Sequence, residues 1–110
     1  MGNDNRPARV AAQLRQEIAR LVARDLSDPR LEGLIVASVA LSADLRVAKV
    51  FWRLASVETG AELEARKNDA QSALERASGR LKRVVTSRLG LRFAPELRFH
   101  YDAGQDARDR

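Results

Sequence analysis

The sequence contains no cysteine and only one histidine among its 110 residues. The absence of cysteine excludes disulfides and thiolate metal sites, and it is compatible with a reducing compartment. The first ten residues, MGNDNRPARV, lack the apolar core of a signal peptide. No apolar run approaches the roughly 20 residues that cross a membrane. We therefore expect an unprocessed cytoplasmic protein with no membrane partner.

Aromatic residues are also scarce, at 5% of the chain, although 45% of the residues are hydrophobic. The core is therefore expected to consist mainly of leucine, valine, isoleucine and alanine. A chain of this length forms one domain, of which about two-thirds of the unfolded surface is buried. We expect a monomeric domain over residues 6–102, with flexible ends at 1–5 and 103–110.

Catalytic patterns are missing as well. His100 alternates out of the apolar face of the last predicted strand, which is typical of an ordinary surface histidine. The chain has no glycine-rich phosphate loop, no His/Cys ligand spacing and no Ser-His-Asp arrangement. We expect no enzymatic activity, no cofactor and no metal.

What the chain does have is a local excess of positive charge. Its 20 basic and 15 acidic residues leave a net charge of +5. The stretch from Glu75 to Arg92 holds six basic residues and one acidic residue, so it accounts for the whole surplus. The six are Arg76, Arg80, Lys82, Arg83, Arg88 and Arg92. A surplus confined to one stretch indicates contact with nucleic acid or phosphate rather than a solvated face.

Apolar periodicity predicts the elements. Pro7 suits the first turn of a helix whose buried stripe is Val10, Leu14, Ile18 and Leu21, and which ends near Asp28-Pro29. A second helical pattern includes Leu63, Ala70, Leu74 and Ala77. The pattern resumes after Gly79 with Leu81, Val84, Val85 and Leu89, and Gly90 ends it. We predict two helices here, separated at Gly79.

Three stretches alternate with the period of a strand. The first has a face of Ile35, Ala37, Val39 and Leu41, and it is expected to pair antiparallel with the second. The second has Ala48, Val50, Trp52 and Leu54 on one face and Val47, Lys49, Phe51 and Arg53 on the other. The third alternates Leu97, Phe99 and Tyr101 with Arg98 and His100. The order helix-strand-strand-helix-helix-strand indicates an α+β domain, with helices on one face of a three-stranded sheet.

Two aromatic residues on the second strand are candidate stacking platforms for bases. Trp52 shares its face with Ala48 and Val50, which favours a core position. Phe51 stands between Lys49 and Arg53. Its face either contacts RNA or is lightly covered by its own long side chains, and the pattern does not separate these alternatives.

The candidate site is the basic stretch around Gly79. On a helix, Arg76, Arg80 and Arg83 project from one face. A break at Gly79 exposes backbone N–H groups that favour phosphate, and the missing Cβ lets an RNA backbone approach. The simpler alternative is that Ala77-Ser78-Gly79 only bends two helices around a small core. The predicted RNA contacts are Arg76, Ala77, Ser78, Gly79, Arg80, Lys82 and Arg83, with Arg6, Arg9 and Lys49 as additional candidates.

Several spaced motifs resemble the ribosome-binding factor A family. They are RPARV from Arg6, DPR from Asp28, DLRVAKVF from Asp44 and RLGLRFAPELRFHYD from Arg88. The resemblance implies a type II KH-like fold of order αββααβ. It also implies an interrupted Ala-x-Gly helical kink, here Ala77-Ser78-Gly79, in place of the usual GxxG loop.

The same resemblance implies a partner. Family members bind the free small (30S) ribosomal subunit and its 16S rRNA, and they support late maturation, including processing of the RNA 5′ end. It further implies that the protein is associated with growth in the cold and that ribosome-associated GTPases promote its release from the subunit. The alternative function from the residues alone is a protein-interaction module whose basic kinked helix docks an acidic protein partner.

Overall fold

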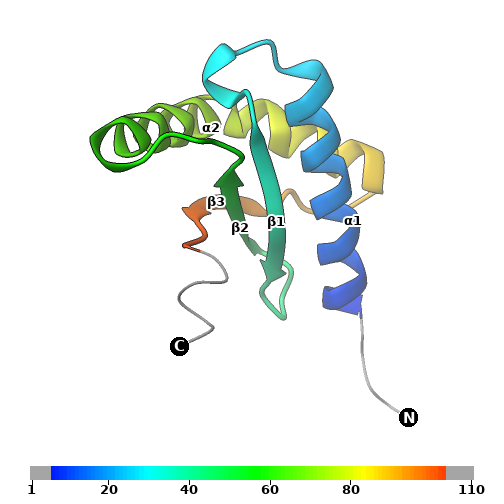
Figure 1. Cartoon of the computed structure of the whole chain (residues 1–110). Helices are drawn as coiled ribbons and strands as arrows, with labels where there is room; N and C mark the ends of the chain where they lie inside the picture. Colours follow the sequence, from blue (N-terminus) through cyan, green and yellow to red (C-terminus); the bar gives the residue numbers. More distant parts are fainter. Residues whose placement is uncertain (1–5, 104–110) are drawn as a thin grey trace.

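Three strands form one mixed sheet on which two helices pack (Figure 1). The computed structural model describes residues 6–103. The elements are α1 (Arg6–Arg20), a π turn η1 (Leu21–Asp25), a 3₁₀ turn η2 (Pro29–Leu31), β1 (Leu34–Leu41), β2 (Val47–Leu54), α2 (Gly60–Leu89) and β3 (Glu96–Tyr101). β2 is central, antiparallel to β1 and parallel to β3. The predicted α+β class and the antiparallel pairing of the first two strands are confirmed.

The second helical region is one helix, so the predicted separation at Gly79 is wrong. α2 runs without interruption through Ala77-Ser78-Gly79, and the element order is αββαβ. The buried residues Ala70, Leu74, Leu81 and Val85 keep helical spacing across the glycine. A glycine in a helix costs only about 1 kcal/mol, whereas each fully buried leucine or valine contributes about 1.5–3 kcal/mol. Packing therefore outweighs the local preference to break.

The C-terminal end of α2 is as predicted. Gly90 adopts a left-handed conformation with φ 63°, and its N–H bonds back to the last turn of the helix. The N–H of Leu91 donates to the carbonyl of Thr86 at 3.0 Å, which completes the cap. Glycine takes this conformation without the Cβ penalty. The chain then turns toward β3.

β1 contains a bulge, and because of it the predicted core face of this strand is partly wrong. Val36 pairs with Trp52, but Ser38 pairs with Phe51, so Ala37 is an extra residue in β1. The extra residue exchanges the two faces of the strand. Val36 is therefore buried and Ile35 is 42% exposed, contrary to prediction, whereas Val39 and Leu41 pack against the core as expected.

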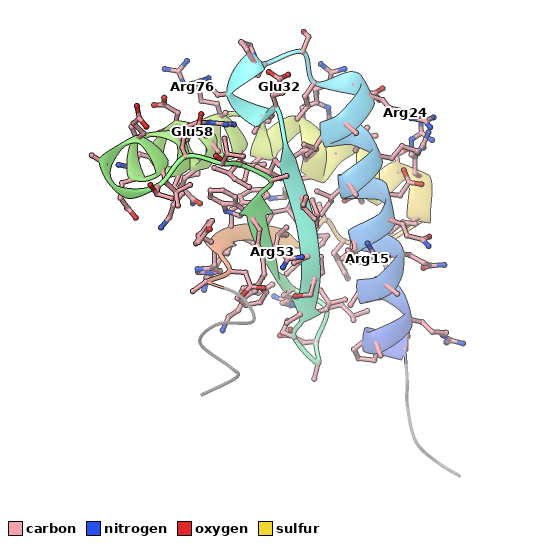
Figure 2. All side chains as sticks on the ribbon, viewed as in Figure 1. Arg15, Arg24, Glu32, Arg53, Glu58 and Arg76 are labelled. Atoms are coloured by element: carbon pink, nitrogen blue, oxygen red, sulfur yellow. The ribbon has the colours of Figure 1, made fainter. Side chains whose placement is uncertain are left out.

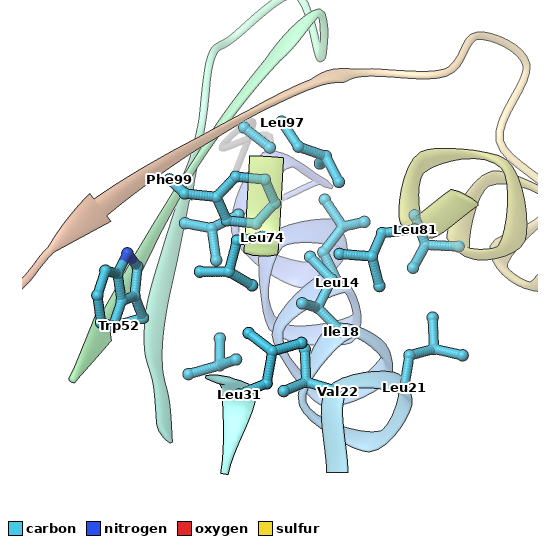
Figure 3. Packing of buried hydrophobic residues seen from close by; sticks show 14 of the residues in the cluster. Leu14, Ile18, Leu21, Val22, Leu31, Trp52, Leu74, Leu81, Leu97 and Phe99 are labelled. Carbon is cyan, nitrogen blue, oxygen red and sulfur yellow. The ribbon is translucent and has the colours of Figure 1, made fainter. Parts of the chain in front are cut away.

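The core lies between the helices and one face of the sheet (Figure 3). Leu14 and Ile18 of α1 meet Leu74 and Leu81 of α2, and all four are 0–1% exposed. Trp52 is 1% exposed, so its predicted position in the core is confirmed. Both helices cover the same face, as predicted, and no helix of residues 6–103 covers the opposite face of the sheet.

The predicted flexible ends, 1–5 and 103–110, lie outside the described residues except for Ala103, so they stay predictions. Within residues 6–103, neither helix combines the length and the apolar character that a membrane crossing requires.

Candidate nucleic-acid interface

Arg76 and Arg80 line a hollow between α2 and the η1–η2 segment. The hollow has a volume of about 530 Å³, and Arg30 of η2 lies on its other side. Figure 2 shows Arg76 projecting at the η2 end of the molecule, far from Arg53 on the sheet. Asp25 and Asp28 also line the hollow, so three guanidinium groups meet two carboxylates. Sequence reasoning missed Arg30 as a site residue, although the DPR motif contains it.

Arg30 is fixed by Asp28. The Asp28 carboxylate accepts hydrogen bonds from the backbone N–H, Nε and Nη2 of Arg30, at 3.0, 3.0 and 2.6 Å. The side-chain bonds and then the backbone bond from Arg30 lower the pKa of Asp28 to about 2. This carboxylate therefore stays ionised near neutral pH and holds the guanidinium in a defined orientation.

Arg83 continues the exposed face of Arg76 and Arg80, but Lys82 does not. Two residues along an α-helix correspond to a rotation of about 200°, so Lys82 points away from Arg80. Lys82 is half-buried, and its charge helps lower the pKa of Glu96, after the larger effect of Arg98. Helical geometry thus divides a cluster that is continuous in sequence.

Gly79 does not form an anion site of the predicted kind. The uninterrupted helix has no N-terminus at this point, so its N–H groups are not freed for phosphate. The glycine is exposed, and apart from its chain neighbours and its own helical backbone no heavy atom lies within 4 Å of the position that a Cβ would take. Close approach of an RNA backbone to this bare surface is compatible with the geometry. Ala77 and Ser78 are half-buried beside it.

Arg6 and Arg9 lie in a second hollow, distant in sequence from the first. This cavity, of about 650 Å³, is bounded by the start of α1, the β1–β2 turn and the segment after α2. The segment after α2 contributes Arg92 and Phe93, and the Arg92 guanidinium lies over the Phe93 ring at 5.9 Å. The sequence placed Arg92 in the basic stretch, but only the fold brings it beside Arg6 and Arg9.

Lys49 lies on the open face of the sheet. Its register partner on β3 is Arg98. Two residues further along, and therefore on the same face, Phe51 pairs with His100, and their ring centroids are 5.7 Å apart. Arg98 is paired with Glu96. The predicted site residues therefore do not form one surface. Arg76, Ala77 and Arg80 line the first hollow, Arg6 and Arg9 line the second cavity, Lys49 lies on the sheet face, and Lys82 lies on the Glu96 side of α2.

Comparison with known proteins identifies the family to which this chain belongs. The family model described as ribosome-binding factor A matches residues 6–110. The chain belongs to the ribosome-binding factor A family. The ribosome-binding factor A of Sorangium cellulosum is 47% identical over 105 residues, which cover 96% of this chain and 82% of that protein.

Solved structures of the family agree with the fold. The crystal structure of ribosome-binding factor A from Thermus thermophilus is 33% identical, with a TM-score of 0.72 over 86% of this chain and 94% of that one. A homology model of the Thermus thermophilus factor, fitted into a cryo-EM map of a 30S–RbfA complex, has a TM-score of 0.66 at 33% identity over 86% of this chain and 92% of that one. These ribosome-binding factor A structures confirm the KH-like assignment.

Proposed function

We propose that this family member is a non-catalytic, cytoplasmic ribosome assembly factor that binds the free small subunit through its 16S rRNA. The Thermus factor is described in a complex with the 30S subunit, and that description supports the same partner here. The role is binding of an immature subunit conformation, which favours the RNA fold that nucleases process at the 5′ end. Release by ribosome-associated GTPases, action as a monomer and support of growth in the cold belong to the same proposal.

One observation carries the proposal. Seven basic side chains form ion pairs within the described chain: Arg20, Arg30, Arg46, Arg66, Lys67, Arg88 and Arg98. Arg76, Arg80 and Arg83 form none with residues 6–103, although they share one face of α2. Unpaired arginines on one helical face are available to phosphate oxygens, which they bind in a bidentate manner.

The test is co-sedimentation with purified small subunits across a salt series. The variant replaces Arg76, Arg80 and Arg83 with glutamine, and its matched control replaces Arg15, Arg20 and Arg24, which lie along α1 and η1. Each lost phosphate contact lowers the salt slope by about 0.7–0.9, so the first variant should lose about two to three units. The control carries the same net charge and should keep the slope.

A first variant with the affinity and salt slope of the unmodified protein would reject the α2 assignment. Failure of the unmodified protein to co-sediment would reject the function itself. Binding to deproteinised 16S rRNA separates RNA recognition from docking on a ribosomal protein.

A further inference from the structure

We propose that the cavity between the start of α1 and the segment after α2 receives one unstacked nucleotide of single-stranded RNA. This inference rests on the proposed function. It names a ligand for a cavity whose apolar lining is not explained by phosphate contacts alone. The cavity is distinct from the hollow at Arg76, since the two share no lining residue. Its volume, about 650 Å³, lies in the range of small-molecule sites.

The cavity combines apolar walls with a cationic rim. Its apolar residues come from four parts of the chain: Val10 of α1, Leu41 and Leu45 around the β1–β2 turn, Leu89 at the end of α2, and Leu91, Phe93 and Pro95 after it. Arg6, Arg9 and Arg92 supply the charge. Apolar walls suit the flat face of a base, and guanidinium groups suit the phosphate attached to it.

The charge balance favours an anion. Among residues 6–103, Asp44 is the one carboxylate that lines the cavity, together with the guanidinium groups of Arg6, Arg9 and Arg92. It is already engaged within the β1–β2 turn, where its carboxylate accepts hydrogen bonds from the Ser42 hydroxyl at 2.8 Å and the Arg46 N–H at 3.1 Å. Arg9 and Arg92 therefore supply positive charge to the rim that Asp44 does not balance, and this charge suits a phosphate.

Phe93 is the aromatic surface that a base would use. It is 68% exposed, and only two other large hydrophobic residues of the described chain are exposed, Ile35 and Val57. Neither of those two lines the cavity. Bases of any identity stack on aromatic rings, and arginine adds a cation–π contribution. Arg92 over Phe93 already provides this pairing of a cation with an exposed ring.

Two of the lining residues, Gln13 and Leu45, have properties that bear on the ligand. Gln13 lines it with an amide, which offers both a donor and an acceptor to the edge of a base. Leu45 has φ 63°, the one positive value among the non-glycine residues of 6–103. A leucine in the left-handed region is strained, and this strained residue contributes an apolar side chain to the cavity wall.

The geometry favours single-stranded over double-stranded RNA. A base in a duplex is stacked and paired, so it presents only its edge and cannot enter a concave site. An unstacked base can enter, and RNA-binding proteins recognise such bases by stacking and hydrogen bonding. The expected ligand is therefore a nucleotide in a loop, a junction or an RNA end.

The experiment uses a single-stranded RNA of roughly ten nucleotides with a central 2-aminopurine, and a duplex of the same sequence. The full chain should quench the 2-aminopurine on binding, because the base stacks on Phe93. Phe93→Leu should bind the single strand about ten-fold more weakly and without quenching, with unchanged affinity for the duplex. The control Val57→Ala, at an exposed hydrophobic residue that does not line the cavity, should behave like the unmodified protein.

Three results would overturn the proposal. The first is that Phe93→Leu binds the single strand with the same affinity and the same quenching as the unmodified protein. The second is that the unmodified protein does not quench the 2-aminopurine. The third is that a polyglutamate peptide displaces the RNA at a concentration comparable to that of the RNA. The last result assigns the cavity to an acidic protein segment. Co-sedimentation of the same proteins with small subunits separates the cavity proposal from the proposed function. If the unmodified protein binds small subunits but one of the three results is found, only the nucleotide cavity is rejected. If the unmodified protein does not bind small subunits, the proposed function is rejected.

Discussion

Asp28 holds Arg30 in a bidentate ion pair, with Oδ2 2.6 Å from Nη2 and Oδ1 3.0 Å from Nε. The same Oδ1 accepts the backbone N–H of Arg30, which caps η2. A short sequence motif thus becomes a rigid arginine at the edge of the hollow that Arg76 and Arg80 line. A fixed guanidinium loses less side-chain entropy when it binds phosphate than a free one does.

Replacing Arg30 with glutamine should raise the pKa of Asp28 from about 2 toward 3.8. The lowered pKa means that the ion pair contributes to stability fully above pH 3.8, and that this contribution is lost as the pH falls through about 2. In the variant the pH dependence below 3.8 should be weaker. A carboxyl NMR titration measures both proteins. Asp44, whose pKa is lowered first by Ser42, is the internal control, and an unchanged Asp28 would contradict the assignment.

Gly79→Ala should stabilise the protein by about 0.5–1 kcal/mol. The glycine lies within a continuous helix, and the added Cβ meets open space. Chemical denaturation measures the change. The opposite control is Gly33→Ala, which should destabilise because Gly33 has φ 78° and the Ala55 carbonyl oxygen lies 3.1 Å from the new Cβ. Destabilisation by Gly79→Ala would restore the helix break as the better description.

The same Gly79→Ala variant tests the remaining functional role of the glycine. If an RNA backbone approaches Gly79 closely, the added methyl group should weaken small-subunit binding although the fold is more stable. Co-sedimentation at fixed salt measures this. Unchanged affinity would show that the glycine makes no such contact.

Arg83→Gln and Lys82→Gln should differ, although the two residues are adjacent. Arg83 shares the exposed face of Arg76 and Arg80, so its removal should lower the salt slope of subunit binding by about 0.7–0.9. Lys82 lies on the Glu96 side of α2 and should leave the slope nearly unchanged. Equal slopes for the two variants would mean that the RNA surface extends around the helix.

Gln71→Ala should destabilise the protein by about 1–3 kcal/mol. The Gln71 Oε1 accepts the indole N–H of Trp52 at 3.0 Å, and its amide donates to the Phe99 carbonyl at 2.9 Å. The alanine variant leaves the buried indole donor without this partner. Thermal or urea denaturation gives the value, and exposed Gln16→Ala on α1 is the control, expected within about 0.5 kcal/mol of the unmodified protein. Equal stability of the Gln71 and Gln16 variants would contradict the structural role.

Val36→Ala should cost about 2 kcal/mol, whereas Ile35→Thr should stay within about 0.5 kcal/mol. The bulge at Ala37 buries Val36 and exposes Ile35. Urea denaturation distinguishes the two. The reverse order of stability would support the regular strand that simple alternation predicts.

The helical stripes could be predicted because helical periodicity is a local property. Val10, Leu14, Ile18 and Leu21 are all buried as their spacing indicates. The bulge in β1 could not be predicted in the same way, because it exists only in the register between β1 and β2. Pattern reasoning therefore assigned Val39 and Leu41 correctly and Ile35 wrongly within a single strand.

By itself the sequence determined which stretches are helix and which are strand, the core stripes of the helices, the Gly90 cap and the basic stretch, since each depends on neighbours a few residues apart. Only the tertiary structure decided how those charges are used. Burial of Leu74, Leu81 and Val85 keeps α2 continuous through Gly79, and the helical rotation then separates Lys82 from Arg80. Chain folding also brings Arg92 beside Arg9, because the cavity depends on packing between distant segments and not on their order in the chain.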